Sequence, residues 1–383
     1  MGIINSKAIA RLLALALLLG AGPALAARHV ETVEHRFAAN EFRELELLNL
    51  AGEVRVTAGK ELLIRASIHG QGDDDAKARA NAALVKPELK RGGGKLEVIT
   101  QFPVQDYDEF VYVRKGGGSG WFGFGSRTVT NYLGERVSVR ASGRGLAVHA
   151  DYEITVPAGM TVKIVNRVGD VVAENVEGDL TLDTASGDVG VRGGKGDVHA
   201  DTGSGAVTVR DRTGNVSADT GSGSVSVSGV RGKVVADTGS GSVTLRDIVG
   251  DVEADTGSGS VTLEKITGSI EADTGSGSVQ GKELSAVRRL HVDTGSGSVR
   301  MEGDLGALED LDIDTGSGGV TLLTTAALNM RLKASAGSGG VRIDLPEMKD
   351  VRSSRNEFEA TVGNGKGRGV IDTGSGGIRI SQQ

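Results

Sequence analysis

The chain contains no cysteine among its 383 residues. This absence excludes disulfide cross-links, thiol catalysis and a lipid anchor on an N-terminal cysteine. Proline occurs only five times, and aromatic residues make up 3% of the chain. Outside the N-terminus, no segment approaches the run of about 18 apolar residues that a membrane-spanning helix needs. We therefore expect no membrane span in the mature chain and a fold that is stable without disulfides.

The N-terminus predicts export. Lys7 and Arg11 precede the apolar stretch 12–19, and residues 24–26 (Ala-Leu-Ala) fit a signal-peptidase site, so residues 1–26 are typical of a secretory signal peptide. We expect a periplasmic, cell-surface or secreted protein. Without this segment the chain has 41 basic and 50 acidic residues, a net charge of −9, which disfavours nucleic acid as a partner.

One pentapeptide, Asp-Thr-Gly-Ser-Gly, dominates the sequence that remains. It occurs eight times, and two degenerate copies start at Asp183 and Ser335. From 183 to 273 the copies follow one another at steps of 18 residues. A fixed period of this length predicts stacked structural repeats. The eight complete copies start at Asp201, Asp219, Asp237, Asp255, Asp273, Asp293, Asp314 and Asp372.

One repeat, residues 255–272, divides into two similar halves, each a glycine-containing turn followed by a strand with alternating apolar residues. The pattern predicts that Val261, Leu263, Ile270 and Ala272 point inward. The sequence therefore predicts an all-β fold, a single-chain parallel β-solenoid with coils of about 18 residues. Side chains would fill its narrow interior, so we expect no internal ligand cavity and no cofactor.

The chain before the regular repeats is less uniform. We expect residues 27–160 to form an irregular β-rich capping region and residues 161–383 to form the regular solenoid. Residues 73–84 predict one short helix, because three aspartates open it and alanine dominates its body. The six histidines show no metal-ligand spacing, so we expect no metal site; they are His29, His35, His69, His149, His199 and His291.

Nine of the twelve aromatic residues lie between Phe102 and Tyr152, many of them in a glycine-rich loop at 103–132. Two interpretations of Trp121, Phe122 and Phe124 in that loop stay open. The rings could cover the end of the solenoid core, or they could form an exposed contact surface for a partner.

The repeated aspartates invite several interpretations. Asp-Thr-Gly-Ser is also the active-site string of pepsin-like proteases, but those enzymes bring together a single pair of aspartates rather than a row. We interpret Asp201, Asp219, Asp237, Asp255 and Asp273 as a structural turn ladder whose carboxylates accept backbone amide hydrogen bonds, with weak binding of divalent cations as the alternative. We expect no catalytic residues. An ice-binding role for the threonine ladder is disfavoured, because the strand period turns Thr256 inward.

The chain resembles the bacterial putative-adhesin family of β-strand repeat proteins, the DUF4097 group. Three features carry the resemblance: the strand-glycine-strand unit at 47–56, the Tyr-x-Ile-x-Val-Pro-x-Gly passage at 152–159, and the Thr-x-Ser-Gly coils, as at Thr184. It covers most of residues 40–383. The resemblance implies an exported or envelope-facing β-solenoid with no known catalytic residues.

We accordingly expect a non-enzymatic envelope or surface protein that acts as an adhesin or binding module. Its partner would be an unknown envelope protein, a glycan or a surface, and we expect a monomer. The alternatives are an envelope-stress sensing or signalling component that acts with a membrane partner, and a polysaccharide-active β-helix enzyme. The last is disfavoured because no cluster of acidic and basic residues stands out.

Overall fold

A computed structural model of the chain describes residues 27–113 and 127–383. The predicted signal peptide and the rings of Trp121, Phe122 and Phe124 lie outside the described residues. The chain divides into two compact units, residues 1–196 with 200–205, and residues 197–199 with 206–383. Both are built almost entirely from β-strands, so the predicted all-β solenoid is confirmed.

The described residues of unit 1 contain one helix, α1 (Asp75–Ala82), within the range that the sequence predicts. Asp74 caps it, because its side chain accepts the backbone N–H of Lys77. The strands of unit 1 are β1 (Ala27–Phe37), β2 (Glu44–Ala51), β3 (Val54–Ala58), β4 (Leu62–Gly72), β5 (Lys86–Gly92), β6 (Lys95–Gln101), β7 (Glu109–Val111), β8 (Arg127–Tyr132), β9 (Glu135–Arg140), β10 (Val148–Val156), β11 (Thr161–Val168), β12 (Val171–Glu174), β13 (Leu180–Ser186) and β14 (Val189–Arg192).

The strands of unit 1 form two facing sheets and a small third one, with orders β1-β4-β10-β3-β12-β14, β5-β6-β2-β11-β13 and β7-β9-β8. Strands β2 and β3 already form a complete coil. They pair in parallel with β11 and β12, more than a hundred residues later in the chain. The intervening segment adds antiparallel pairs, in which β4 joins β1 and β10. Regular coil geometry therefore begins at residue 44. β1 precedes this first coil, and the other irregular elements follow it.

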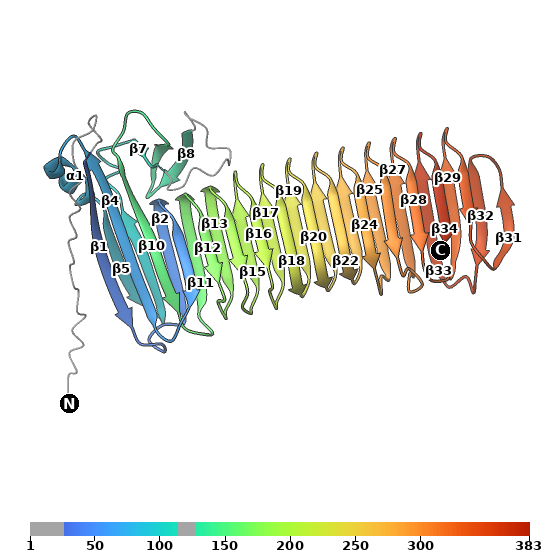
Figure 1. Cartoon of the computed structure of the whole chain (residues 1–383), viewed down its shortest axis with the longest axis horizontal. Helices are drawn as coiled ribbons and strands as arrows, with labels where there is room; N and C mark the ends of the chain where they lie inside the picture. Colours follow the sequence, from blue (N-terminus) through green and yellow to red (C-terminus); the bar gives the residue numbers. More distant parts are fainter. Residues whose placement is uncertain (1–26, 114–126) are drawn as a thin grey trace. The chain divides into compact units, whose positions relative to one another are not determined.

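Unit 2 is the regular part of the solenoid, where each coil contributes one strand to each of two parallel sheets (Figure 1). β15 (Val198–Thr202) has residues in both units. The other strands are β16 (Val207–Arg210), β17 (Val216–Thr220), β18 (Val225–Arg231), β19 (Val234–Thr238), β20 (Val243–Val249), β21 (Val252–Thr256), β22 (Val261–Thr267), β23 (Ile270–Thr274), β24 (Val279–Leu284), β25 (Arg289–Thr294), β26 (Val299–Gly303), β27 (Asp310–Thr315), β28 (Val320–Thr324), β29 (Met330–Ala336), β30 (Val341–Asp344), β31 (Met348–Ser353), β32 (Glu357–Val362), β33 (Gly367–Thr373) and β34 (Ile378–Gln382).

The core of unit 2 lies between its two sheets. Val261, Leu263, Ile270 and Ala272 are all buried, as the alternation of apolar residues predicts. Each such residue stacks on its equivalent in the next coil; Val243, for example, is the register partner of Val261. The apolar interior is therefore a set of continuous columns of Val, Leu, Ile and Ala.

The last coil in the sequence is not the last in the stack. β33 pairs directly with β27, and β34 pairs with β28, so the coil of residues 367–382 lies between two earlier coils. The coil of β29 and β30 lies on its other side. Beyond it, β32 and β31 continue the sheet in antiparallel pairing. The change from parallel to antiparallel pairing marks the end of the regular repeat.

Candidate functional site

The repeated aspartates of unit 2 form a row on its outer face. Seven of them occupy the same register position on neighbouring strands, from Asp219 to Asp372. Each is the next-to-last residue of its strand, one position before the turn. In a β-strand this position faces away from the buried threonine that follows it, so the carboxylates point to solvent. We call these seven residues the carboxylate row: Asp219, Asp237, Asp255, Asp273, Asp293, Asp314 and Asp372. Asp201, the first aspartate of the predicted ladder, is the next-to-last residue of β15 (Val198–Thr202), which neighbours β17 in the same sheet.

The threonine of the motif, not the aspartate, organises the turn. Thr256 is fully buried, and its hydroxyl donates a 2.7 Å hydrogen bond to the carbonyl of Gly241 in the preceding coil. The same oxygen accepts the N–H of Gly259 in its own coil, at 3.0 Å. Thr238 and Thr274 repeat both bonds. The hydroxyl therefore ties each turn to the turn of the coil before it.

The second glycine of the motif is required because successive turns lie very close together. A Cβ on Gly259 would lie 1.8 Å from the carbonyl oxygen of Gly241, which leaves no room for any side chain. The same approach recurs at Gly277 and Gly297. Threonine and glycine thus have structural roles, whereas the aspartate and serine of the motif face solvent.

Neighbouring carboxylates in the row disfavour one another's charge. The pKa of Asp237 is raised by partial burial and by the negative charges of Asp219 and Asp255 on the adjacent strands. Burial and Asp255 likewise raise the pKa of Asp273, although the Thr274 N–H partly offsets this. The pKa of Asp372 is raised by burial and by Asp314. The row is therefore a surface on which like charges are held close together.

The aromatic residues have two different locations. Phe102, Phe110 and Tyr132 form edge-to-face contacts in the core of unit 1, with ring centroids 5.8 and 5.9 Å apart. Part of the aromatic concentration thus fills the interior of that unit. For Trp121, Phe122 and Phe124, which lie outside the described residues, both interpretations remain predictions.

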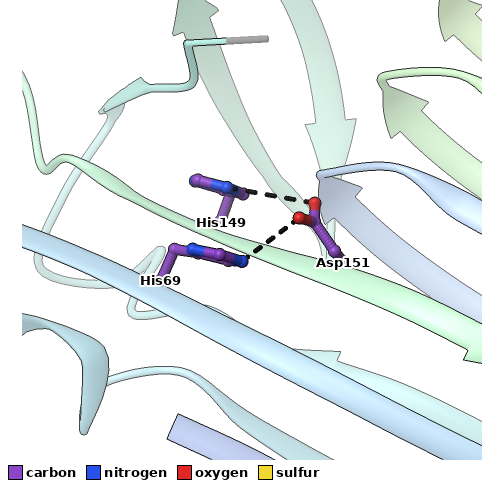
Figure 2. Close-up of side chains that lie close together, drawn as sticks. All are labelled: His69, His149 and Asp151. Carbon is purple, nitrogen blue, oxygen red and sulfur yellow. Dashed lines mark ion pairs between the residues drawn. The ribbon is translucent and has the colours of Figure 1, made fainter. Parts of the chain in front are cut away.

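A second group of polar side chains lies on unit 1, at the pairing of β4 and β10. His69 and His149 are direct cross-strand partners, and their rings stack with centroids 4.3 Å apart and an angle of 3° between the planes. Asp151 follows His149 by two residues, so it lies on the same face of β10. Its carboxylate reaches both rings: His69 Nε2 lies 3.1 Å from Oδ2, and His149 Nε2 lies 3.9 Å from Oδ1 (Figure 2).

The backbone between β2 and β3 holds this carboxylate in place. The N–H of Glu53 donates a 3.0 Å hydrogen bond to Asp151 Oδ1. Gly52 permits this approach: it has a φ of 138°, and a Cβ there would lie 2.0 Å from the carbonyl oxygen of Ala150. Burial raises the pKa of Asp151, but the contacts with His69, the Glu53 N–H and His149 outweigh it and lower the pKa to about 2. Asp151 is therefore ionised at neutral pH.

Sequence analysis missed this group because His69 is 80 residues away from His149. One local signal was present: residues 149–151 read His-Ala-Asp in a segment with strand periodicity, which places the imidazole and the carboxylate on one face. Only the antiparallel register of β4 against β10 brings in the second histidine.

No helix among the residues that the structure describes is long and apolar enough to cross a membrane. No curated protein matches the chain. A crystal structure of a putative cell adhesion protein from Clostridium sporogenes aligns with 94% of this chain and 100% of its own, at 10% identity and a TM-score of 0.17. At that score the likeness carries no argument about fold or function.

The family comparison concerns the regular coils. The model of the family described as Toastrack DUF4097 matches residues 195–381, which is nearly the whole of unit 2. It agrees with the resemblance seen in the Thr-x-Ser-Gly coils. Over these residues the chain is similar to the Toastrack DUF4097 family.

Proposed function

We propose that this protein is a non-enzymatic, exported binding or adhesion module of the cell envelope, and that unit 2 presents the carboxylate row to an extended partner. The observation that carries the proposal is the in-register repetition of seven aspartates on one outer face. The family supports an adhesin-like protein. Export rests on the sequence of residues 1–26, and the choice of the row as the contact surface rests on its geometry.

The row is difficult to explain by folding alone. The threonine and the glycines of each motif make the contacts that stack the coils, whereas the aspartate adds repulsion between neighbouring strands. Asparagine or serine would fit the same exposed position without that repulsion. Because the spacing along the row is the strand spacing of about 4.8 Å, a partner with closely repeated positive charges or hydrogen-bond donors would neutralise it along its length.

The same geometry disfavours proteolysis. Pepsin-like catalysis needs one close pair of carboxylates that shares a proton within a cleft. In unit 2 the motif aspartates are exposed, and Asp237 has an equivalent carboxylate on each side, so no single pair is set apart. The repetition fits multivalent contact, in which many weak interactions add along an extended surface.

The test is binding of the mature protein to isolated envelope material, compared with a row variant that removes three adjacent charges. We expect the row variant to fold normally and to bind more weakly than the wild type, with a weaker dependence on salt. The row variant carries Asp237→Asn, Asp255→Asn and Asp273→Asn.

A charge-matched control removes three exposed carboxylates of the same unit that lie outside the row, and we expect it to bind like the wild type. Equal binding by the row variant and the wild type would show that the row is not the contact surface. If both variants bound equally weakly, net charge alone would explain the weaker binding, and this result would also contradict the proposal. The control carries Asp344→Asn, Glu347→Gln and Asp350→Asn.

A further inference from the structure

The group on unit 1 is separate from the carboxylate row and has different chemistry. Among the described residues, His69, His149 and Asp151 bring two imidazole nitrogens and one carboxylate oxygen within 4.8 Å of one another. Two histidines and one carboxylate, with a further coordination position left open, are a common donor set for divalent first-row transition metals.

The spacing of the donor atoms matches such a site. Zinc–nitrogen and zinc–oxygen bonds of about 2.0–2.2 Å in a tetrahedron place neighbouring donors roughly 3.4 Å apart. The two nitrogen-to-carboxylate distances, 3.1 Å from His69 to Oδ2 and 3.9 Å from His149 to Oδ1, end on different oxygens of Asp151 and lie on either side of this value. Movements of less than an ångström at the tips of the side chains would therefore equalise the two distances.

The orientation of the two rings also differs from that of a coordinated pair. The two rings are nearly parallel, whereas a metal bound to both Nε2 atoms lies close to both ring planes. Binding therefore requires the rings to tilt so that their planes converge on the side of the two Nε2 atoms and Asp151. This motion needs only side-chain rotation, because the backbone register of β4 and β10 already places both rings on the same side as the carboxylate (Figure 2).

The surroundings are suited to holding an ion. The side chains of His69 and Asp151 are 14% and 19% exposed and that of His149 is 7% exposed, so an ion can reach the group although most of it is shielded from water. The Glu53 N–H donates to Oδ1 and restrains the carboxylate, as outer hydrogen bonds do for metal ligands. The ring of Tyr112 lies 5.0 Å from that of His149 and restricts the space on that side.

We propose that His69, His149 and Asp151 form a binding site for a divalent first-row transition metal, with Zn²⁺ as the best match. The bound ion bridges β4 and β10 and stabilises their pairing. The site does not depend on the binding role proposed for unit 2. The ion would bind the two strands through their side chains and would be removed by a chelator.

The experiment uses the mature protein, stripped of metal with EDTA and dialysed, and titrated with Zn²⁺ against a chromophoric chelator. We expect one equivalent of Zn²⁺ to bind and to raise the melting temperature. Removing one ligand should weaken binding by more than the roughly tenfold that loss of an outer hydrogen-bond partner of a ligand costs. His149→Ala tests this directly, and Asp151→Asn keeps the shape of the side chain in case the histidine variant folds poorly. His199→Ala, an exposed histidine outside the group, is the matched control.

Cobalt supplies a second, spectroscopic measurement. Co²⁺ should give the visible absorption bands of a four- or five-coordinate site in the wild type and in His199→Ala, and should lose them in His149→Ala. The proposal is overturned if the wild type binds no stoichiometric Zn²⁺, or if Asp151→Asn and His149→Ala bind it as tightly as the wild type. A melting temperature that is the same with and without Zn²⁺ would contradict the proposal that the ion holds β4 and β10 together.

Discussion

The substitution Thr256→Val tests the structural role of the repeated motif. The change keeps the shape of the side chain and replaces its hydroxyl by a methyl group. The hydroxyl donates to the Gly241 carbonyl at 2.7 Å and accepts the Gly259 N–H at 3.0 Å. A hydrogen bond contributes about 0.5–1.5 kcal/mol net, and a buried polar group left without a partner costs about 1–3 kcal/mol. The added methyl group offsets about 0.8 kcal/mol. We therefore expect a net loss of about 1–3 kcal/mol in the free energy of unfolding.

Two further variants separate the hydroxyl from other effects. Thr262→Val makes the same change on the outer face of the next strand, where Thr262 is only partly buried, and should alter stability by no more than about 0.5 kcal/mol. Thr256→Ser keeps the hydroxyl and loses the methyl group. Denaturant unfolding followed by circular dichroism gives the stabilities. Hydrogen exchange of the Gly259 amide reports the local bond, which is useful because repeats can open separately.

The reasoning is refuted if Thr256→Val is as mild as Thr262→Val. It is also refuted if Thr256→Ser is more damaging than Thr256→Val, because methyl packing rather than hydrogen bonding would then hold the turns together.

The remaining predictions concern close packing, charge and the core. Gly259→Ala should destabilise unit 2 by several kcal/mol or prevent its folding, because the new methyl group would clash with the backbone of the preceding coil. Gly92 has open space around it, so Gly92→Ala should leave the free energy of unfolding nearly unchanged in the same assay. Asp237→Asn should raise the melting temperature slightly at low salt. Because the pKa of Asp237 is raised in the folded state, its ionisation lowers the stability of the protein as the pH rises through that pKa. The stabilising effect of the asparagine should therefore be present at neutral pH and disappear in acid. A stabilising effect that grew in acid would contradict this prediction. Val243→Asp should unfold the surrounding coils, because it places an unpaired charge in a fully buried column, and a melting temperature close to that of the wild type would show that the column can open to water.

Much of the regular fold could be predicted from the sequence, because the repeat period and the alternation of apolar residues are local properties. An 18-residue step with two strands of period two specifies which residues point inward, and Val261, Leu263, Ile270 and Ala272 are buried as expected. The helix followed from its acidic start and alanine-rich body in the same way. These features depend on a few neighbouring residues, which a sequence displays directly.

The role of each residue in the repeated motif could be assigned only from the structure. The sequence predicts that the aspartate carboxylate accepts the amide hydrogen bonds of the turn. In the structure the hydroxyls of Thr238, Thr256 and Thr274 accept the N–H of the second glycine of each motif, and the carboxylate of Asp273 accepts the N–H of Thr274. The reason is the direction of the side chain: the last residue of the strand points inward, toward the backbone of the next turn, and the aspartate before it must point outward. The tight approach of successive glycines is likewise a property of stacked coils and of no single coil.

Long-range placement was decided only by the tertiary structure. The coil of residues 44–58 stacks on strands more than a hundred residues later, and the last coil of the chain lies between two earlier ones. The histidine group arises in the same way, because an antiparallel register sets His69 opposite His149 across 80 residues of chain. The repeat, its period and its inward face are encoded locally and can be predicted from the order of residues. Which distant strands become neighbours, and therefore which polar groups meet, depends on the pairing of whole strands, which no local pattern records.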